Sequence, residues 1–235
     1  MTASPLPAGH VLRPLHAGDL PALRLLHAAV MRALPDPALF RLFGGPEQFL
    51  ADHLGARGES LGVFAGDRAV AYGSLTRPAA GDRDNYAGDL GWSPERAGRV
   101  ALLSAAMVDP SHRGLGLHRA LIAARIELAR ERGAPELLVR AAPANAPSRR
   151  TLLAHGFAVI WLGVQAEGSL RHVMWRPIAG AAWQATAPEE AALTWAAGDD
   201  LAHQQRLLQA GWMGVRMRAG DTAVGFAPER AGSAA

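Results

Sequence analysis

The hydrophobic pattern in the middle of the chain predicts a strand, a glycine-rich turn and a helix, in that order. The run Val100–Val108 is apolar, is bounded like a buried strand and is too short to span a membrane. An Asp-Pro pair then breaks it. A helical period runs from Leu117 to Arg132, with one apolar face made by Leu117, Leu121, Ala124 and Leu128. Gly133 and Pro135 supply the stop signal for this helix.

The rest of the chain also alternates between strand and helix patterns. Short apolar or alternating runs predict strands at His10–Pro14, Ser60–Ala65, Ala69–Thr76, Glu136–Ala142, Phe157–Val164 and His172–Pro177. Helices are predicted after Asp19 as N-cap, around Pro46–Leu54, and over Ala146–His155. Arg77–Gly98 is rich in Gly, Pro and Asp, which favours an extended loop. Strands that alternate with helices place the chain in the α/β class.

The last part of the chain resembles the segment before it. At an offset of 55 residues (138 to 193), Leu138, Leu152 and Gly156 match Leu193, Leu207 and Gly211. With a shorter hairpin, Val173–Pro177 resembles Val224–Pro228. The tail is therefore predicted to repeat a strand–helix–hairpin unit, which could extend the sheet or form a dimer contact. Asp200 falls where Asn145 sits, and no glycine-rich loop precedes it, so this copy would lack a phosphate site.

Composition limits the chemistry that the chain can perform. The content of 49% hydrophobic and 19% charged residues is typical of a globular protein. Cysteine is absent, which excludes disulfides, thiolate metal ligands and a cysteine nucleophile. All 24 basic residues are Arg, so Schiff-base chemistry on a lysine is excluded as well. With a net charge of +3 and no basic block, nucleic acid is not an expected partner.

Targeting and metal signals are also missing from the sequence. The first residues lack the basic and apolar regions of a signal peptide, and no apolar run reaches the length of a membrane span. We therefore expect a cytoplasmic protein without a membrane partner. His112, His118 and His155 do not have the spacing of metal ligands, so no metal is expected.

The turn between the central strand and its helix has the features of an anion site. Arg113, Gly114 and Gly116 precede the helix, and backbone N–H groups at a helix N-terminus bind anions well. Glycine allows a phosphate to approach the backbone closely. No Gly-Lys-Ser/Thr follows, which excludes a Walker A loop, and Arg119 stands where a dinucleotide fingerprint needs Gly or Ala.

Two motifs resemble those of the GNAT N-acetyltransferases. Arg113-x-x-Gly116-x-His118 resembles the family's pyrophosphate loop, Gln/Arg-x-x-Gly-x-Gly/Ala, with His118 as a departure. Asn145, Ser148 and the pair Gly156-Phe157 resemble a later motif of the same family. The resemblance covers about residues 10 to 178. It implies a mixed, mostly antiparallel central sheet flanked by helices, to which the repeated strand–helix–hairpin unit would be a C-terminal extension.

The resemblance also implies acetyl-CoA as co-substrate and a set of residues that bind it. Backbone N–H groups and two arginines would hold the pyrophosphate, and the end of the central strand would supply a donor to the thioester carbonyl. Asn145 would hold the pantetheine arm from the other side. The expected cofactor-binding residues are Met107, Val108, Arg113, Gly114, Leu115, Gly116, Leu117, His118, Arg119, Asn145 and Ser148.

Catalytic groups are harder to identify in this chain. The acceptor amine must lose a proton before it attacks, and the nearest acids by sequence are Asp89, Glu95 and Asp109, although a water chain could serve instead. The family's thiolate-protonating Tyr corresponds to Leu152, so His155, Ser148 or solvent would have to replace it. By analogy with the family, residues that could face the acceptor are Asp36, Phe40, Phe43, Glu47 and Asp52.

The sequence therefore predicts an N-acetyltransferase that moves an acetyl group from acetyl-CoA to a primary amine by direct attack on the thioester. The alternative is a non-catalytic acyl-CoA-binding or interaction module with the same fold, because the Tyr and a carboxylate in the central strand are missing. The expected organisation is a flexible tail over 1–9, the acetyltransferase domain over 10–178 and the extension over 179–235. The acceptor is unidentified, and the chain is expected to be a monomer or a homodimer.

Overall fold

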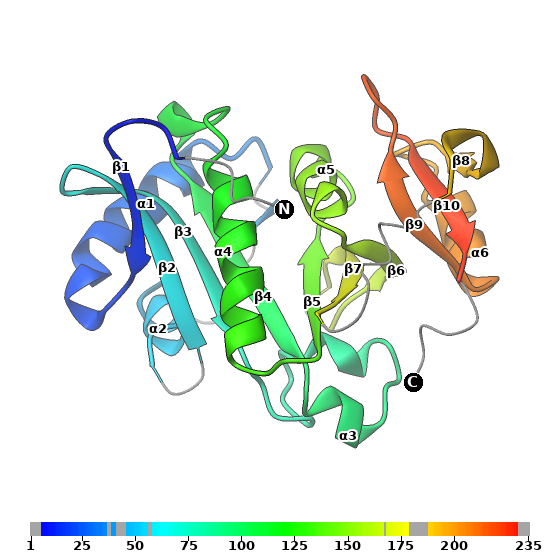
Figure 1. Ribbon diagram of the computed structural model, residues 1–235, viewed down its shortest axis with the longest axis horizontal. Coiled ribbons are helices and arrows are strands. Elements are labelled where there is room, and N and C mark those ends of the chain that lie inside the picture. Colours follow the sequence, from blue (N-terminus) through cyan, green and yellow to red (C-terminus); the bar gives the residue numbers. More distant parts are fainter. Residues whose placement is uncertain are drawn as a thin grey trace. The chain divides into compact units, whose positions relative to one another are not determined.

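A computed structural model describes residues 6–36, 39–40, 46–55, 58–166, 168–178 and 188–229 (Figure 1). The chain consists of two compact units, residues 1–137 and residues 138–235. No helix in the described ranges is long and apolar enough to cross a membrane.

The first unit is built on four antiparallel strands in chain order. β1 (His10–Pro14) pairs with β2 (Gly58–Ala65), β2 with β3 (Arg68–Thr76), and β3 with β4 (Ala101–Val108). A tight hairpin joins β2 to β3, where Gly66 has a φ of 58°. Such a backbone conformation is readily available only to glycine.

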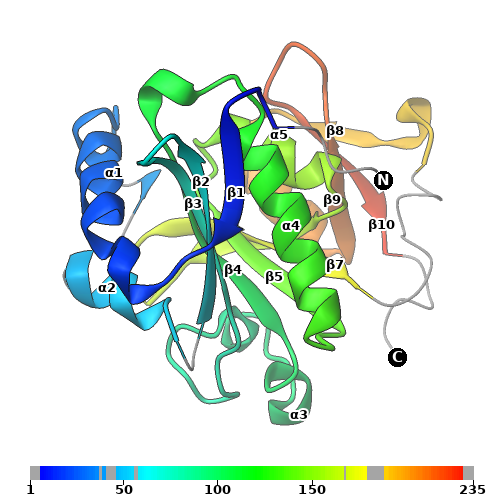
Figure 2. The same ribbon diagram turned by 60° about the vertical axis from the view of Figure 1, so that its left-hand side comes forward.

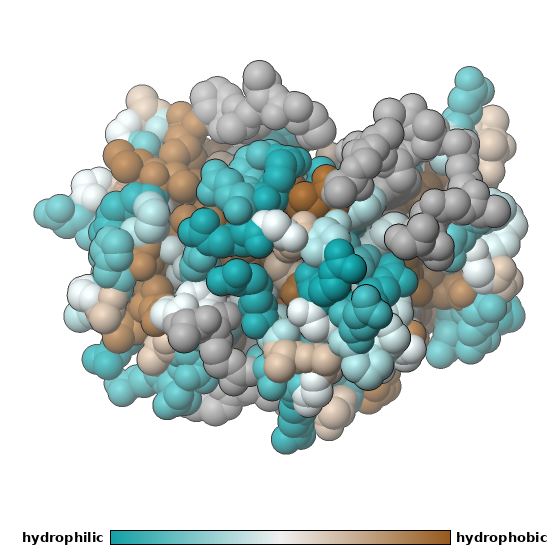
Figure 3. Space-filling model, turned by 60° about the horizontal axis from the view of Figure 1, so that its bottom comes forward, coloured by the Kyte–Doolittle hydropathy of each residue, from teal (hydrophilic) through white to brown (hydrophobic). Residues whose placement is uncertain are grey.

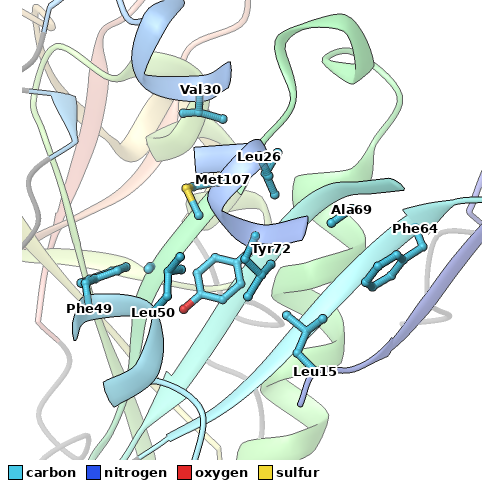
Figure 4. Packing of buried hydrophobic residues seen from close by; sticks show 11 residues of the cluster. Leu15, Leu26, Val30, Phe49, Leu50, Phe64, Ala69, Tyr72 and Met107 are labelled. Carbon is cyan, nitrogen blue, oxygen red and sulfur yellow. The ribbon is translucent and has the colours of Figure 1, made fainter. Parts of the chain in front are cut away.

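Helices cover both faces of these strands (Figure 2). α1 (Leu20–Arg32) and α2 (Pro46–Asp52) lie on one face, and α4 (Leu117–Glu131) lies on the other. On the α1 and α2 face, Tyr72 is completely buried, with its ring beside Leu50 (Figure 4). On the α4 face, Leu117 and Leu121 pack against apolar side chains of β2 and β3. The apolar stripes of the helices thus bury both surfaces of the sheet.

Two helix details differ from the sequence predictions. The buried face of α4 is rotated from the predicted stripe, because Ala124 and Leu128 are only partly buried while Arg125 is completely buried. Asp19 precedes α1 but makes no side-chain cap. Its carboxylate accepts hydrogen bonds from Arg13 at 2.7 Å and from the backbone of His16 at 2.9 Å. A charged partner on β1 outcompetes the helix cap for this side chain.

The segment between β3 and β4 was predicted to be an extended loop but contains two short helices. These are a 3-10 turn, Tyr86–Gly88, and α3, Pro94–Ala97. The Asn85 side chain donates to the carbonyl oxygens of Ala79 at 3.0 Å and Ala97 at 2.9 Å, which clamps the two ends of the segment together. The face that carries α3 shows mainly hydrophilic side chains with apolar ones scattered among them (Figure 3).

The second unit contains the other described strands and the α-helices α5 and α6. Its strand order is β5-β7-β6-β9-β10-β8, and β5 (Glu136–Ala141) begins at the boundary between the units. α5 (Ala146–Ala154) precedes the antiparallel hairpin of β6 (Ala158–Val164) and β7 (Leu170–Pro177). The short strand β8 (Thr194–Ala196) is followed by α6 (Leu201–Gln209). The antiparallel hairpin of β9 (Trp212–Met217) and β10 (Val224–Pro228) comes next.

The predicted fold class is confirmed: the protein is mixed α/β, with a mostly antiparallel open sheet flanked by helices. The predicted strands and helices occur within a few residues of their expected ends. Of the expected N-terminal tail, residues 1–5 lie outside the described residues, and Leu6 packs against the α4 side of the first unit.

Candidate functional site

The end of β4 leads into a tightly fixed turn. Asp109 follows the strand, and its backbone N–H donates to the Val70 oxygen at 2.9 Å. Its carboxylate accepts hydrogen bonds from the backbone N–H of Ser111 at 2.9 Å and from the Ser111 hydroxyl at 2.5 Å. Arg68 forms an ion pair with the other carboxylate oxygen. This carboxylate, which is 3% exposed, therefore caps the turn that starts at Pro110.

The same contacts determine the charge of Asp109. Burial alone would raise the pKa of this carboxyl, but the hydrogen bonds from Ser111 and the charges of Arg68 and His112 outweigh burial and lower the pKa below its ordinary value. Asp109 is therefore ionised at neutral pH. A carboxylate with a lowered pKa is a weaker proton acceptor, which makes it poorly suited to be a general base.

The loop that follows exposes the N-terminus of α4. Gly114 and Gly116 have φ angles of 81° and 77°, so both positions need the left-handed conformation that glycine adopts without strain. Gly116 is the N-cap and supplies no side chain to the helix, and its carbonyl accepts the first helical bond from Ala120 at 3.0 Å. The N–H groups of the first turn are consequently open to an anion.

The side chains around this loop favour an anionic ligand. Arg113 and Arg119 are exposed, and among the residues that the structure describes neither has an ion-pair partner. Leu115 is exposed, whereas Leu117 is buried and anchors the helix in the core. His118 is half-buried and has an interaction partner. The loop thus combines open backbone donors with two unpaired guanidinium groups.

β4 contains a bulge that a buried arginine supports. The pairing of β3 with β4 shifts between Ser74, opposite Ala105, and Thr76, opposite Leu102, so β4 carries one extra residue. Arg125 donates to the carbonyl oxygens of Ser74 at 3.1 Å and Ala105 at 2.9 Å. Desolvation lowers the pKa of Arg125 to about 10, which still leaves it charged at neutral pH. The helix α4 thereby fixes the shape of the strand that leads to the loop.

Gly73 makes room for that guanidinium. A Cβ at this position would lie 2.9 Å from Cζ of Arg125. The sequence alone does not indicate that Arg125 is buried, because an arginine within an amphipathic helix is normally a surface residue. The glycine in the facing strand was the only signal, and it can be interpreted only once the two residues are known to face each other.

The other sheet face carries a second group of polar side chains, near α2. The Ser60 hydroxyl donates to the His53 carbonyl oxygen at 2.7 Å and lies 3.5 Å from the Tyr72 hydroxyl. Nδ1 of His53 lies 2.5 Å from the Phe49 carbonyl oxygen. Burial lowers the pKa of His53, so its imidazole is neutral at neutral pH. A carbonyl can only accept, so Nδ1 carries the proton and Nε2 has a free electron pair.

Rings line this region between α1 and α2. The ring centroid of Phe40 lies 6.4 Å from that of His27 and 6.3 Å from that of Phe49, whose ring lies 4.3 Å from His53. Of the acceptor-facing residues predicted from the sequence, Phe40 belongs to this row, whereas Asp36, Glu47 and Asp52 are exposed. Phe43 lies outside the described residues. No sequence motif points to His53, because a single histidine at a helix end matches none.

The remaining predicted residues lie in different surroundings. Met107 is buried in the core on the α1 and α2 face, so only its backbone could serve a ligand, and Val108 is partly buried on the α4 side. Asp89 is half-buried just after the 3-10 turn of the β3–β4 segment. Among the described residues, no group of three or more His, Asp or Glu side chains could hold a metal ion.

Asn145, Ser148 and His155 belong to the second unit. Asn145 is the N-cap of α5 and accepts a hydrogen bond from the Ser148 backbone at 3.2 Å. His155 is buried, and its Nδ1 lies 2.8 Å from the Thr151 carbonyl oxygen. Leu152, at the position where the resemblance expected a tyrosine, is buried in the apolar interior. At the predicted positions this unit therefore has a helix cap, but no exposed side chain that could act as the general acid for the thiolate.

Comparison with known proteins identifies the family. The acetyltransferase (GNAT) family matches residues 28–157, which is more than half of the chain and includes the strand, the loop and the helix described above. The chain belongs to the GNAT acetyltransferase family. No sequence among the curated proteins matches the chain significantly.

Solved structures share the fold at low sequence identity. YncA from Salmonella typhimurium, solved with its cofactor acetyl-CoA, is 19% identical with a TM-score of 0.55, over 77% of this chain and 99% of that protein. The ribosomal-protein-S18-alanine N-acetyltransferase from Escherichia coli is 19% identical, with a TM-score of 0.53, and the match covers 73% of this chain and 96% of that protein. The PaiA N-acetyltransferase from Thermoplasma acidophilum, solved with coenzyme A, is 13% identical, with a TM-score of 0.50, and the match covers 72% of this chain and 98% of that protein.

Proposed function

We propose that the protein is an acetyl-CoA-dependent N-acetyltransferase that acetylates a primary amine. The amine nitrogen forms a bond to the thioester carbonyl carbon, the C–S bond breaks, and the CoA thiolate leaves after a base has taken a proton from the amine. The observation that carries this proposal is the open N-terminus of α4 with its two glycines of positive φ. Membership of the GNAT family and the cofactors of its structural neighbours support it.

In this proposal the loop before α4 binds the pyrophosphate of the cofactor. The N–H groups from Gly114 to His118 donate to phosphate oxygens, and Arg113 and Arg119 add charge. The bulged strand β4 supplies backbone donors to the thioester near Met107 and Val108, and Arg125 acts as a positioning residue that holds this strand in shape. Asn145 and Ser148 remain proposed contacts to the pantetheine arm.

Binding of the cofactor is tested by calorimetry with acetyl-CoA, free CoA, ATP and NAD. The wild type is expected to bind both CoA species, and Gly116→Glu to lose binding because it places a carboxylate where the phosphates sit. Gly133→Glu is the matched control: Gly133 has a φ of 70° at the opposite end of α4, and no described residue lies within 4 Å of its Cβ position. Equal binding by Gly116→Glu and Gly133→Glu would overturn the placement of the cofactor.

The general base is proposed to be His53, in place of the acids identified from the sequence. Its Nε2 has a free electron pair and its pKa is lowered, so the imidazole is unprotonated when an ammonium group arrives. It directly follows α2, in the region that we expect, by analogy with the family, to face the acceptor. Asp109 is proposed to be a turn cap, because its carboxylate is already bonded to Ser111 and Arg68. Asp89 remains a secondary candidate for the base, and His155 remains a candidate for the acid that protonates the leaving thiolate.

A pH profile of kcat separates these roles. His53→Asn is expected to lower kcat by about 10²–10⁴-fold and to remove the acidic limb of the profile, as expected for the loss of a general base. His16→Asn, an exposed histidine of the same unit, is the control and should leave the profile unchanged. An unaltered acidic limb in His53→Asn, together with its loss in Asp89→Asn, would transfer the role to Asp89.

The second candidate function is a non-catalytic acyl-CoA-binding module. It is favoured by the buried Leu152 at the position of the family's tyrosine and by the lack of a carboxylate in β4. Thiols are good leaving groups, so the missing acid is expected to slow acetyl transfer without abolishing it. Release of CoA from acetyl-CoA in the presence of a panel of amines distinguishes the two: binding without turnover supports the module, and turnover supports the enzyme.

A further inference from the structure

The second unit contains two copies of one strand–helix–hairpin arrangement. The first half-unit, residues 138–177, contains most of β5 followed by α5, β6 and β7, and the second half-unit, residues 193–228, contains β8, α6, β9 and β10. The two helices have the same length, and their bounds, Ala146–Ala154 and Leu201–Gln209, differ by the 55 residues found in the sequence. The sequences of the two half-units therefore align over the whole helix without an insertion or a deletion.

The hydrogen bonds around the two helices repeat at the same offset. Asn145 and Asp200 are the N-caps, and each accepts a bond from the backbone three residues later, at 3.2 Å and 3.0 Å. Both helices are followed by a glycine of positive φ, Gly156 at 85° and Gly211 at 78°. Each of these glycines donates to a leucine carbonyl at 3.0 Å. The repeat found in the sequence therefore extends to the hydrogen bonds at both ends of the helices.

The two hairpins repeat their irregularities as well. In the first hairpin the pairing skips Ile160, and in the second it skips Val215, which is 55 residues later. The flanking pairs correspond: Val159 lies opposite Met174, and Gly214 lies opposite Phe226. The second strands of the hairpins thus correspond at an offset of 52 (174 to 226). The sequence-based match of Pro177 with Pro228 is consequently one residue out of register.

A pseudo-two-fold axis relates the half-units. The strands β5, β7 and β6 of the first half-unit are equivalent to β8, β10 and β9 of the second. The strand order β5-β7-β6-β9-β10-β8 is therefore symmetric about the pair β6–β9. At its centre β6 pairs antiparallel with β9, and Val159 lies opposite Gly214, its own equivalent. A residue that pairs with its equivalent lies on the axis of an isologous contact. Figure 1 shows β9 beside β10, and α6 against β9.

The helices also exchange partners across this axis. α5 of the first half-unit packs against β9 of the second, and α6 of the second packs against β6 of the first. Between them His172, on β7, lies 3.0 Å from the side-chain oxygen of Gln204, on α6. Gln204 is the equivalent of Arg149, and all three side chains are buried. Each half-unit therefore completes the core of the other, as the two subunits of a homodimer do.

We propose that the edge of β6 is a dimerisation surface of the first half-unit, and that the second half-unit is a fused copy which occupies this surface within a single chain. A strand edge with free N–H and C=O groups is a site for pairing with another chain. The fused copy closes this edge with β9 and ends the sheet instead with β8, a strand of only three residues. Trp195 on β8 is covered by the Arg218 guanidinium, 4.4 Å from its ring. This proposal does not depend on the proposed enzymatic activity.

The test uses the full chain with a specific protease site placed between residues 178 and 188. After cleavage, the piece that carries the second half-unit is expected to remain bound and to comigrate with the rest on native size-exclusion chromatography. Separation of the two pieces without denaturant would overturn the proposal, because a tail that is merely attached has no partner surface to hold it. Denaturing electrophoresis confirms that cleavage is complete.

Two substitutions locate the contact that holds the pieces together. Gly214→Glu is expected to release the cleaved piece, since a Cβ there would lie 3.0 Å from Cβ of Val159. Gly220→Glu is the matched control in the β9–β10 hairpin, where φ is 81° and none of the residues that the structure describes lies within 4 Å of the Cβ position. Gly214→Ala, a smaller change, is expected to weaken retention on dilution without loss of folding. Equal retention in all three variants would overturn the proposal.

The released larger piece tests the dimerisation surface itself. With the β6 edge uncovered, it is expected to form a dimer whose dissociation constant is measured by sedimentation equilibrium. Addition of the second half-unit should convert this dimer back to the one-to-one complex. A released piece that keeps its circular dichroism spectrum but stays monomeric at all concentrations would overturn the proposal that this edge is a dimerisation surface.

Discussion

His172 and Gln204 are joined by a hydrogen bond of 3.0 Å between Nε2 of the imidazole and the amide oxygen, inside the second unit. The amide nitrogen of Gln204 donates to the Ala197 carbonyl at 2.7 Å, which fixes the orientation of the amide. Nε2 of His172 therefore carries the proton, and Nδ1 is buried with no hydrogen-bond partner in the described part of the chain. Burial above all, with the charge of Arg149, lowers the pKa of His172 to about 3, although the bond to Gln204 opposes the shift.

This neutral histidine makes the stability of the second unit depend on pH. The unfolded chain protonates His172 below about 6.5 and the folded chain only below about 3, so between these values the unfolded state holds more protons. The free energy of unfolding is thus expected to fall as the pH falls through this window, by up to about 1.4 kcal/mol per pH unit. Urea unfolding at pH 7 and pH 5 measures the change.

Substitution of the histidine identifies its share of that change. His172→Gln cannot titrate, so its free energy of unfolding should fall less between pH 7 and pH 5 than that of the wild type. His203→Gln, on the helix that carries Gln204, removes a histidine outside the buried contact and serves as the control. If the free energy of unfolding of His172→Gln falls as much between pH 7 and pH 5 as that of the wild type, other groups cause the pH dependence.

The two fully buried arginines are expected to respond oppositely to substitution by methionine. Arg125 donates to three carbonyl groups, so Arg125→Met removes three hydrogen bonds from the interior and should lower the free energy of unfolding by about 2–4 kcal/mol. Among the described residues, Nε and Nη1 of Arg149 have no acceptor, so Arg149→Met removes a buried charge that is only partly hydrogen-bonded. That variant should be as stable as the wild type or more stable by about 1 kcal/mol. Urea unfolding at pH 7 compares them, and equal losses would contradict this interpretation.

Much of the fold follows from local patterns in the sequence. The apolar run before Asp109 becomes β4, and the helical period from Leu117 becomes α4 to within one residue of its predicted end. The glycines at 114 and 116 have the positive φ angles that a tight turn requires. The repeat is also visible, because Asn145 and Asp200, both good N-caps, stand at the same place in each copy.

Other features depend on partners that are distant in sequence. Arg125 is buried because it faces Gly73 and two carbonyls on neighbouring strands, none of which its own helix pattern reveals. Asp19 binds Arg13 in preference to capping its helix, since the arginine becomes a neighbour only after β1 has formed. Local helix or strand propensity depends only on the residues of one segment. The partner of a charged side chain depends on which groups the fold brings close to it.

Asn85 is expected to control the order of the segment between β3 and β4. Its side chain bonds to Ala79 and Ala97, and its oxygen accepts from the Ala87 backbone at 3.1 Å. Asn85→Ala removes the donor to the buried Ala97 carbonyl, at a cost of about 1–3 kcal/mol. Proteolysis of the segment should therefore become faster in Asn85→Ala, but not in the control Arg83→Ala, an exposed residue of the same segment. Equal proteolysis rates would mean that other contacts hold the segment.

The pair at the pseudo-two-fold axis should be energetically coupled. A Cβ on Gly214 would lie 3.0 Å from Cβ of Val159 and 2.9 Å from Cγ1 of Val224, so Gly214→Ala is expected to cost about 1–3 kcal/mol by overpacking. Val159→Ala removes two methyl groups from a fully buried side chain and should cost a similar amount.

In the double variant the smaller side chain at 159 makes room for the new methyl group at 214. The combined loss should therefore be smaller than the sum of the single losses by about 0.5–1 kcal/mol. Gly225→Ala provides the control cycle with Val159→Ala, because a Cβ at Gly225 would meet Leu193 and Trp195. That cycle should be additive. Urea unfolding of all the variants gives the two coupling energies, and equal values would show that Val159 and Gly214 do not share the axis as a packed pair.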